Sequence, residues 1–276
     1  MKRKQAWFWY IAPLMTGIII FCIIPFIVSG RYVFGSGTVR FEFAGTENIV
    51  SLFENGVFRM ALKNTISFIL AAVPITVFAS FVSAFYLNKS RLVQRILLLP
   101  LLMPVAAMAL GWISLFGGDG IISVILKCFG KAGTDCFNGP YARLIFLLIY
   151  FVKNFGYMTF IFSGAMVNIP KEYREAFLID SNSTLSYIRH VAAPLLSPVI
   201  FFVTVFSTAN CMQIFREIYS IYGDNPPQGL YMLQSFMNNN FQKLNYNRLC
   251  TAAFIVVLFF SFMVMIYLWL NKRRKW

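Results

Sequence analysis

Five side chains that can hydrogen-bond or stack stand inside otherwise apolar stretches of the chain. Lys153, Asn154 and Tyr157 fall within one stretch, and Asn210 and Gln213 fall within another. Polar groups at membrane depth are costly and usually functional, and Asn and Gln both donate and accept hydrogen bonds. Together with an aromatic face for a sugar ring, this chemistry suits a neutral polyol or sugar as ligand. The alternative is that these groups pair with neighbouring helices.

Three charged residues accompany this polar set. We expect Lys153 to face protein or water rather than lipid. Arg216 and Glu217 lie near the end of the second stretch, so we expect them at the outer membrane interface. No Asp or Glu is then predicted at mid-depth of the membrane.

Groups for covalent catalysis or metal binding are sparse. His190 is the only histidine, and the five cysteines form no Cys-x-x-Cys pair or Cys/His cluster, so no metal or cofactor is predicted. A membrane enzyme would need a nucleophile–base pair or a metal site, which this set does not supply. No G-x-x-x-x-G-K-[ST] motif occurs, so ATP chemistry is not in this chain. Cys128 and Cys136 share a predicted outer loop, where a disulfide and two thiols both remain open.

Composition places the chain in lipid. Hydrophobic residues make up 59% of its 276 residues and charged residues 12%, whereas a soluble domain carries about 25% charge. The net charge is +14, but the basic residues sit in short tracts at the ends of apolar runs. This placement is typical of membrane orientation signals and argues against a nucleic-acid-binding protein.

Six apolar segments are long enough to cross a bilayer, which takes about 20 residues per helix. Their runs do not alternate in polarity as barrel strands would, and helices satisfy their own backbone hydrogen bonds in lipid. We therefore predict an all-α integral membrane protein, a single transmembrane domain over 1–276, with a shorter helix or turn after the fifth span. The predicted spans are 7–30, 64–87, 96–116, 142–168, 191–214 and 250–270.

Basic residues also predict the orientation. Lys2, Arg3 and Lys4 precede a first apolar run that is too long for the core of a signal peptide, so we interpret it as a retained span. With the amino terminus inside, Lys and Arg are about three times denser in the cytoplasmic segments than in the outer ones. Both termini are then cytoplasmic. The cytoplasmic segments would be 1–6, 88–95, 169–190 and 271–276.

The segment 169–190 has more pattern than a simple connector. Pro170 suits the first turn of a helix, and Glu172 is favourable near its positive end. Ser181-Asn182-Ser183 then offers turn chemistry and an N-cap for a second short helix that runs towards Pro194. Two short helices at the membrane surface would form a knob that fits a groove on a soluble partner.

This segment resembles the EAA loop of binding-protein-dependent ABC transporter permeases. Phe177 replaces the second alanine of that pattern, and Ser181 replaces its glycine. The positions that match in type and spacing are Glu175, Ala176, Asp180, Val191 and Pro194. The resemblance implies that the loop holds a coupling helix that docks into an ATP-binding subunit. The implied contact residues are Glu175, Ala176, Phe177, Asp180 and Ser181.

Further elements resemble those of the carbohydrate permeases, over roughly residues 10–270. The maltose-type first-permease subfamily fits best, because the chain ends soon after its last predicted span. The elements concerned are Ala12-Pro13, Asn48, Asn64-Thr65, Leu99-Pro100 with Met103-Pro104, and Asn225-Pro226-Pro227.

The resemblance implies the type I ABC importer permease fold and a transport subunit rather than an enzyme. It further implies a heterodimer with a second permease, separate ABC ATP-binding subunits, an extracytoplasmic solute-binding protein and a place in the bacterial plasma (inner) membrane. The substrate path would then include Lys153, Asn154, Tyr157, Asn210 and Gln213. The alternative is a secondary transporter or channel subunit without an ATPase, which should show intramembrane carboxylates and internal repeats. The choice between sugar, polyol and sugar phosphate stays open.

Overall fold

The computed structural model describes residues 3–36, 42–87, 91–129, 135–180 and 183–273. Within these ranges six helical segments are long and apolar enough to cross a membrane, which confirms the predicted number of spans. Contacts divide the chain into two compact units, Met1–Arg59 with Phe236–Trp276, and Met60–Ser235. The six segments are Tyr10–Phe34, Gly56–Tyr86, Val105–Cys128, Ala142–Val167, Ser197–Tyr222 and Tyr246–Leu270.

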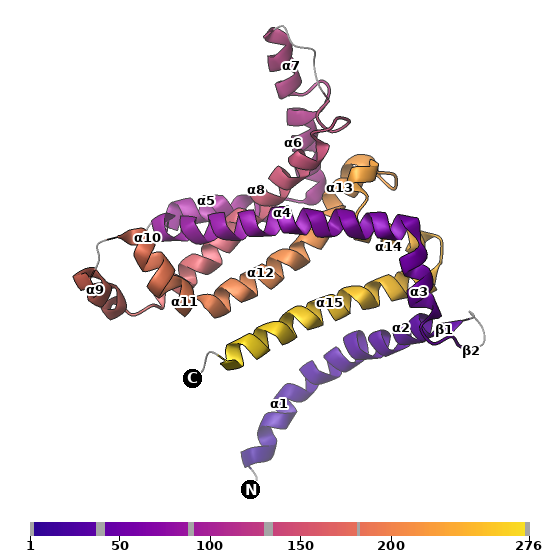
Figure 1. The fold of residues 1–276 in the computed structure, drawn as a ribbon, viewed down its shortest axis with the longest axis horizontal. Helices are drawn as coiled ribbons and strands as arrows, with labels where there is room; N and C mark the ends of the chain where they lie inside the picture. The colour runs from indigo at the N-terminus through magenta and orange to yellow at the C-terminus, as the bar shows by residue number, and fades with distance from the viewer. Residues whose placement is uncertain (1–2, 37–41, 88–90, 130–134, 181–182, 274–276) are drawn as a thin grey trace. The chain divides into compact units, whose positions relative to one another are not determined.

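Two long helical runs dominate the first unit (Figure 1). The first run is α1 (Arg3–Ile18), the π turn η1 (Ile19–Ile23) and α2 (Ile24–Phe34). Pro25, the second residue of α2, has no N–H to donate, and the wider π turn directly precedes α2, as is common where the helical hydrogen-bond ladder is interrupted. The remaining elements are β1 (Gly35–Ser36), β2 (Glu42–Phe43), α3 (Glu47–Glu54), the end of α14 (Leu233–Gln242) and α15 (Tyr246–Arg273).

Aromatic rings hold α2 against α15. The ring of Phe254 lies 6.4 Å from that of Phe26 and 5.7 Å from that of Phe34. Other side chains of the same helical run, such as Phe21 and Ile27, are exposed. An apolar face without a protein neighbour is what a lipid-facing helix presents.

Asn48 closes the carboxyl end of α2. Its Nδ2 lies 3.3 Å from the carbonyl oxygen of Tyr32, 3.1 Å from that of Val33 and 2.9 Å from that of Gly35. The last carbonyls of a helix have no partner within the helix, so one amide donor meets them here. The Asn48 element noted in the sequence therefore has a capping role. It fixes where the first span ends and the turn into α3 begins.

The second unit is a bundle of crossing helices with short helices at their ends (Figure 1). The long helix α4 (Gly56–Leu87) enters it from the first unit. The other elements are α5 (Arg91–Leu102), α6 (Val105–Phe116), α7 (Ile121–Cys128), α8 (Ala142–Val167), α9 (Lys171–Asp180), α10 (Thr184–Tyr187), η2 (Ile188–Ala192), α11 (Ala193–Leu195), α12 (Ser197–Met212), α13 (Phe215–Tyr222), η3 (Gln228–Leu230) and the start of α14.

The predicted third span, 96–116, is not one helix. It breaks at Met103 and Pro104, where α5 ends and α6 begins. Pro104 adopts φ −57° and ψ 140° and has no N–H, so the α5 hydrogen-bond ladder cannot pass through it. The single continuous span predicted from the sequence is therefore corrected to two helices.

The fifth span matches its expectation. A helical run from Thr184 continues into α12, which ends at Met212, and the shorter helix α13 follows after a turn.

The alternative left open for the outer-loop cysteines is also decided, because Cys128 is an exposed free thiol without a disulfide to Cys136.

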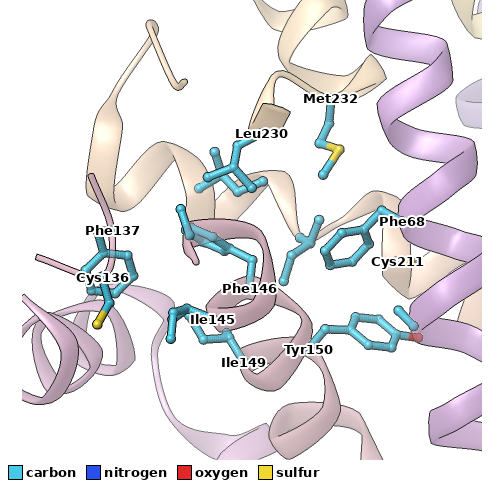
Figure 2. Packing of buried hydrophobic residues seen from close by; sticks show 14 of the residues in the cluster. Phe68, Cys136, Phe137, Ile145, Phe146, Ile149, Tyr150, Cys211, Leu230 and Met232 are labelled. Carbon is cyan, nitrogen blue, oxygen red and sulfur yellow. The ribbon is translucent and has the colours of Figure 1, made fainter. Parts of the chain in front are cut away.

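An aromatic and aliphatic cluster surrounds the first half of α8 (Figure 2). Phe146 and Ile149 are fully buried there, and the ring of Tyr150 meets that of Phe68 edge to face at 6.2 Å. Lipid is as apolar as these side chains, so close packing rather than removal from water must hold membrane helices together. The cluster fixes α8 against α4 and α13 and thereby sets the direction of its polar residues.

Gly156 allows α5 and α8 to touch. A Cβ atom at this position would lie 1.8 Å from the carbonyl oxygen of Leu97, far inside any permitted contact. Small residues let membrane helices approach backbone to backbone. This close contact positions the end of α5, and so the break at Met103 and Pro104, beside the polar residues of α8.

Asn64 and Thr65 tie α4 to the turn that precedes α14. The Asn64 side-chain amide donates to the carbonyls of Gln228, at 2.6 Å, and Tyr231, at 3.1 Å. The Leu233 N–H donates to Thr65 Oγ1 at 2.8 Å. The Asn-Thr pair noted in the sequence is thus a backbone anchor for a segment about 165 residues away along the chain.

Candidate functional site

Three polar pairs join α8 to α12 and α13. The Tyr150 hydroxyl donates to the Ser207 carbonyl at 2.8 Å. One helical turn further along α8, the Asn210 amide donates to Asn154 Oδ1 at 3.1 Å. Lys153 forms a salt bridge with Glu217. Residues three and four apart lie on one face of a helix, so one side of α8 carries all three of these pairs.

These side chains line a cavity of about 310 Å³. Four of the five polar residues predicted from the sequence meet there, namely Lys153, Asn154, Asn210 and Gln213. Tyr157 does not line it, since it lies one turn further along α8 and its ring packs 5.4 Å from that of Phe206. The remaining lining residues are Leu101, Met103, Pro104, Val105, Tyr150, Ile214, Arg216 and Glu217.

Arg216 and Glu217 were predicted near the outer membrane interface but not as cavity residues, and both line the cavity. The side chain of Glu217 is only 2% exposed within the protein. Its Oε1 pairs with Lys153, whereas its Oε2 is buried without a hydrogen-bond partner. A signal was available, because a lysine within an apolar run calls for a counter-charge. Glu217 is the acidic residue nearest in the sequence to the predicted fifth span.

The break in the third span opens onto the same cavity. Met103, Pro104 and Val105 all line it. The side chain of Pro104 cannot cap the amino end of α6, so the first-turn N–H groups of α6 have no side-chain acceptor. Irregular backbone at membrane depth is tolerated where it lines a cavity. The site therefore combines amides, three charged side chains and the positive end of a helix.

The predicted two-helix loop is present. Pro170 directly precedes α9, and Ser183 Oγ caps α10 by accepting from the Ser186 N–H at 3.3 Å. The second helix continues through η2 to Leu195. The ring of Phe177 packs 5.6 Å from that of Tyr187, so this residue braces α9 against α10. Ser181, one of the predicted contact residues, lies outside the described residues.

The two sides of α9 differ. Lys171, Arg174 and Leu178 face a cavity of about 510 Å³ beneath the helix, towards the ends of α4 and α8. Glu175, Ala176 and Ile179 are exposed and do not line this cavity. Ile179 is 86% exposed, and Leu185 on α10 is 75% exposed. A small surface with exposed apolar residues thus stands between α8 and α12.

Six apolar segments and a polar cavity walled by the broken third span, α8 and the fifth span define the class, a multi-pass membrane permease. Residues 49–276 match the family described as the binding-protein-dependent transport system inner membrane component. The chain belongs to this family.

Curated relatives extend over most of the chain. It is 26% identical to the lactose transport system permease protein LacF of Rhizobium radiobacter, over 96% of this chain and 94% of LacF. It is 28% identical to the probable ABC transporter permease protein YesP of Bacillus subtilis, over 86% and 82%. A sn-glycerol-3-phosphate transport system permease protein, UgpA of Yersinia pseudotuberculosis, is 31% identical over 59% of this chain and 58% of UgpA.

Solved structures share the fold. A chain of a bacterial ABC transporter involved in the import of the acidic polysaccharide alginate superposes with a TM-score of 0.82 at 18% identity, covering 100% of this chain and 98% of that chain. The same kind of transporter in complex with an alginate pentasaccharide-bound periplasmic protein gives 0.80 at 18% identity. The predicted ABC importer permease fold is therefore confirmed.

Proposed function

We propose that this chain is the permease subunit of an ATP-driven importer that moves a carbohydrate or related polar solute delivered by an external binding protein. The observation that carries the proposal is the cavity in which Lys153, Asn154, Asn210, Gln213 and Glu217 meet. Family membership supports it, as do relatives named for lactose and sn-glycerol-3-phosphate transport and a solved relative that imports alginate.

The cavity acts on its solute by exchanging hydrogen bonds, without covalent chemistry. The amides of Asn154, Asn210 and Gln213 donate to and accept from hydroxyl groups, and Glu217 Oε2 accepts one more. A volume of about 310 Å³ lies at the lower end of the roughly 300–1,000 Å³ of small-molecule sites. It therefore accepts a small solute or one end of a longer chain.

The loop at α9 and α10 transmits the movement of the ATPase. Its outward side carries Glu175, Ala176 and Ile179, which a groove on a soluble subunit can cover. Phe177 stiffens the loop from within through Tyr187, so a push on α9 is passed to α10 and α12. Asp180 is the last residue of α9, and the resemblance to the EAA loop supports its inclusion in this contact.

Family membership supports the rest of the proposed assembly. A second permease pairs with this chain, and ATP-binding subunits and a binding protein complete the importer. ATP hydrolysis belongs to the ATP-binding subunits. The chain resides in the bacterial inner membrane with both termini in the cytoplasm, since Lys and Arg concentrate in the segments that this orientation places inside.

A secondary transporter or channel is the second candidate, and the buried pair of Lys153 and Glu217 is the observation that favours it. Intramembrane carboxylates often serve ion-coupled transport. The binding-protein-dependent family of the chain weighs against this reading. The energy source of uptake therefore separates the two candidates.

The test is uptake by the chain produced together with a candidate second permease, ATP-binding subunits and binding protein. We expect the ATPase to copurify, the loaded binding protein to stimulate ATP hydrolysis, and orthovanadate to stop uptake. Scrambling residues 170–190 should abolish copurification. Uptake that resists orthovanadate but collapses with a protonophore would establish the secondary transporter instead.

A further inference from the structure

The cavity holds more positive than negative charge. Lys153, Arg216 and Glu217 all line it. Within the part of the chain that the structure describes, Lys153 and Glu217 form the only salt bridge, so the guanidinium of Arg216 has no acidic partner. Resting on the proposed function, we propose that the solute is a saccharide or polyol that carries an anionic group, which Arg216 binds.

The pairing of Lys153 decides where an anion binds. Glu217 already neutralises the ammonium of Lys153, and their mutual attraction is strong in a poorly solvated site. Arg216 is exposed at the cavity and always charged. Its planar fork of donors matches a carboxylate or a phosphate with two parallel hydrogen bonds. The anionic group therefore meets Arg216, and the Lys153–Glu217 pair stays intact.

The broken third span adds to the positive potential. α6 begins at Val105, beside Pro104 and Met103, and all three residues line the cavity. The amino end of a helix carries a partial positive charge and free N–H groups. Half-helices in transporters point such ends at anionic groups of their substrates. Here the helix end and Arg216 belong to one cavity and attract the same kind of charge.

Hydroxyl groups on the ligand would add to its recognition. Glu217 Oε2 is buried and has no partner, and a buried carboxylate oxygen without a donor is costly. A simple inorganic anion would be repelled by this oxygen and would leave it unsatisfied. A sugar acid or a sugar phosphate satisfies both requirements, because a hydroxyl donates to Glu217 while the acidic group reaches Arg216.

This inference replaces the neutral solute favoured by the amides alone. Asn154, Asn210 and Gln213 recognise hydroxyl groups on neutral and acidic sugars equally well. The charged residues therefore account for the difference in affinity between acidic and neutral sugars, and this difference is the specificity of the site. An anionic lipid headgroup shares the chemistry of the acidic group, so the test separates a lipid from a solute.

The experiment uses the complete transporter in nanodiscs of zwitterionic phosphatidylcholine, without its binding protein. Saturation-transfer difference NMR detects weak ligands under these conditions. The acidic probes are digalacturonate and sn-glycerol 3-phosphate, with galactobiose and glycerol as their neutral counterparts. We expect each acidic probe to bind about tenfold or more tightly than its neutral counterpart, as one charge-assisted contact provides.

Two variants make the assignment specific. Arg216→Gln should remove most of the preference for the acidic probes. Arg248→Gln is the matched control, because Arg248 is also exposed and near a helix end but lies outside the cavity, and it should keep the full preference. Glu217→Gln removes the only carboxylate that lines the cavity and should increase the preference.

Three results would overturn the inference. One is equal binding of acidic and neutral probes by the unaltered transporter. A second is an unchanged preference in Arg216→Gln. In the third, nanodiscs of pure phosphatidylcholine show no preference, and the acidic probes are seen only to compete with added phosphatidylglycerol. That result would assign Arg216 to a lipid headgroup. Failure of the ATPase to copurify would instead refute the proposed function, so the two failures are distinguishable.

Discussion

Lys153 on α8 forms a salt bridge with Oε1 of Glu217 on α13, and Oε2 of the same carboxylate is buried without a partner. The two residues are 64 positions apart in the chain. One half of the carboxylate thus connects two helices, while the other half has no polar partner within the chain.

Removing one charge of this pair should destabilise the fold more than removing both charges. Lys153→Met leaves the Glu217 carboxylate buried and uncompensated, at a cost of about 3–5 kcal/mol. The double variant Lys153→Met with Glu217→Met removes both charges and should recover most of that loss. Thermal unfolding of the detergent-purified transporter measures both effects. A double variant as unstable as Lys153→Met alone would contradict this account of the pair.

Gly156 and Gly164 provide a matched comparison on α8. Gly156→Ala forces a methyl group against the Leu97 carbonyl, and overpacking of this kind costs about 1–3 kcal/mol. Gly164 has nothing within 4 Å of the corresponding position, so Gly164→Ala should be neutral or stabilising through its better helix propensity. The melting temperatures of the two variants should therefore shift in different directions, and equal shifts would refute the close contact between α5 and α8.

Asn64 should be less tolerant of Asp than of Ala. Asn64→Ala loses two hydrogen bonds to the 228–231 turn, each worth about 0.5–1.5 kcal/mol. Asn64→Asp loses the same donors and also sets a carboxylate against two carbonyl oxygens. We expect limited proteolysis to cut near residue 228 faster in the Asp variant than in the Ala variant. The reverse order would show that the amide does not act as a donor.

Charge reversal on the outward side of α9 should uncouple transport without unfolding the protein. Glu175 is exposed, so Glu175→Lys should change stability by no more than about 0.5 kcal/mol. We expect uptake and stimulated ATP hydrolysis to be lost while the variant still reaches the membrane. Glu54→Lys, also exposed but on α3, is the control and should retain uptake. Full activity in Glu175→Lys would argue against docking at this face.

The sequence was most informative where one segment determines its own structure. Apolar length predicted the number of spans, and the caps around Pro170 and Ser183 marked both short helices of the loop. Four cavity residues were also identified, because a polar side chain within an apolar run is conspicuous by itself.

Features that need two distant segments could not be predicted. The position of Glu217 depends on how α13 turns after Gln213 and meets α8. Likewise, the role of Gly156 depends on the carbonyl of Leu97, on a different helix. The break at Pro104 is intermediate, because a proline in a membrane helix is tolerated in some packings and ends the helix in others. Only the cavity beside it shows which case applies.

The interrupted third span also acts as a joint. α5 is held to α8 by the backbone contact at Gly156, whereas α6 packs against α13. When α8 and α13 shift relative to one another, the two halves of this span must follow different neighbours, and the flexing falls on Met103 and Pro104. Those residues line the cavity proposed for the solute. We therefore expect any rocking of the bundle to change the width of that cavity without unwinding a helix.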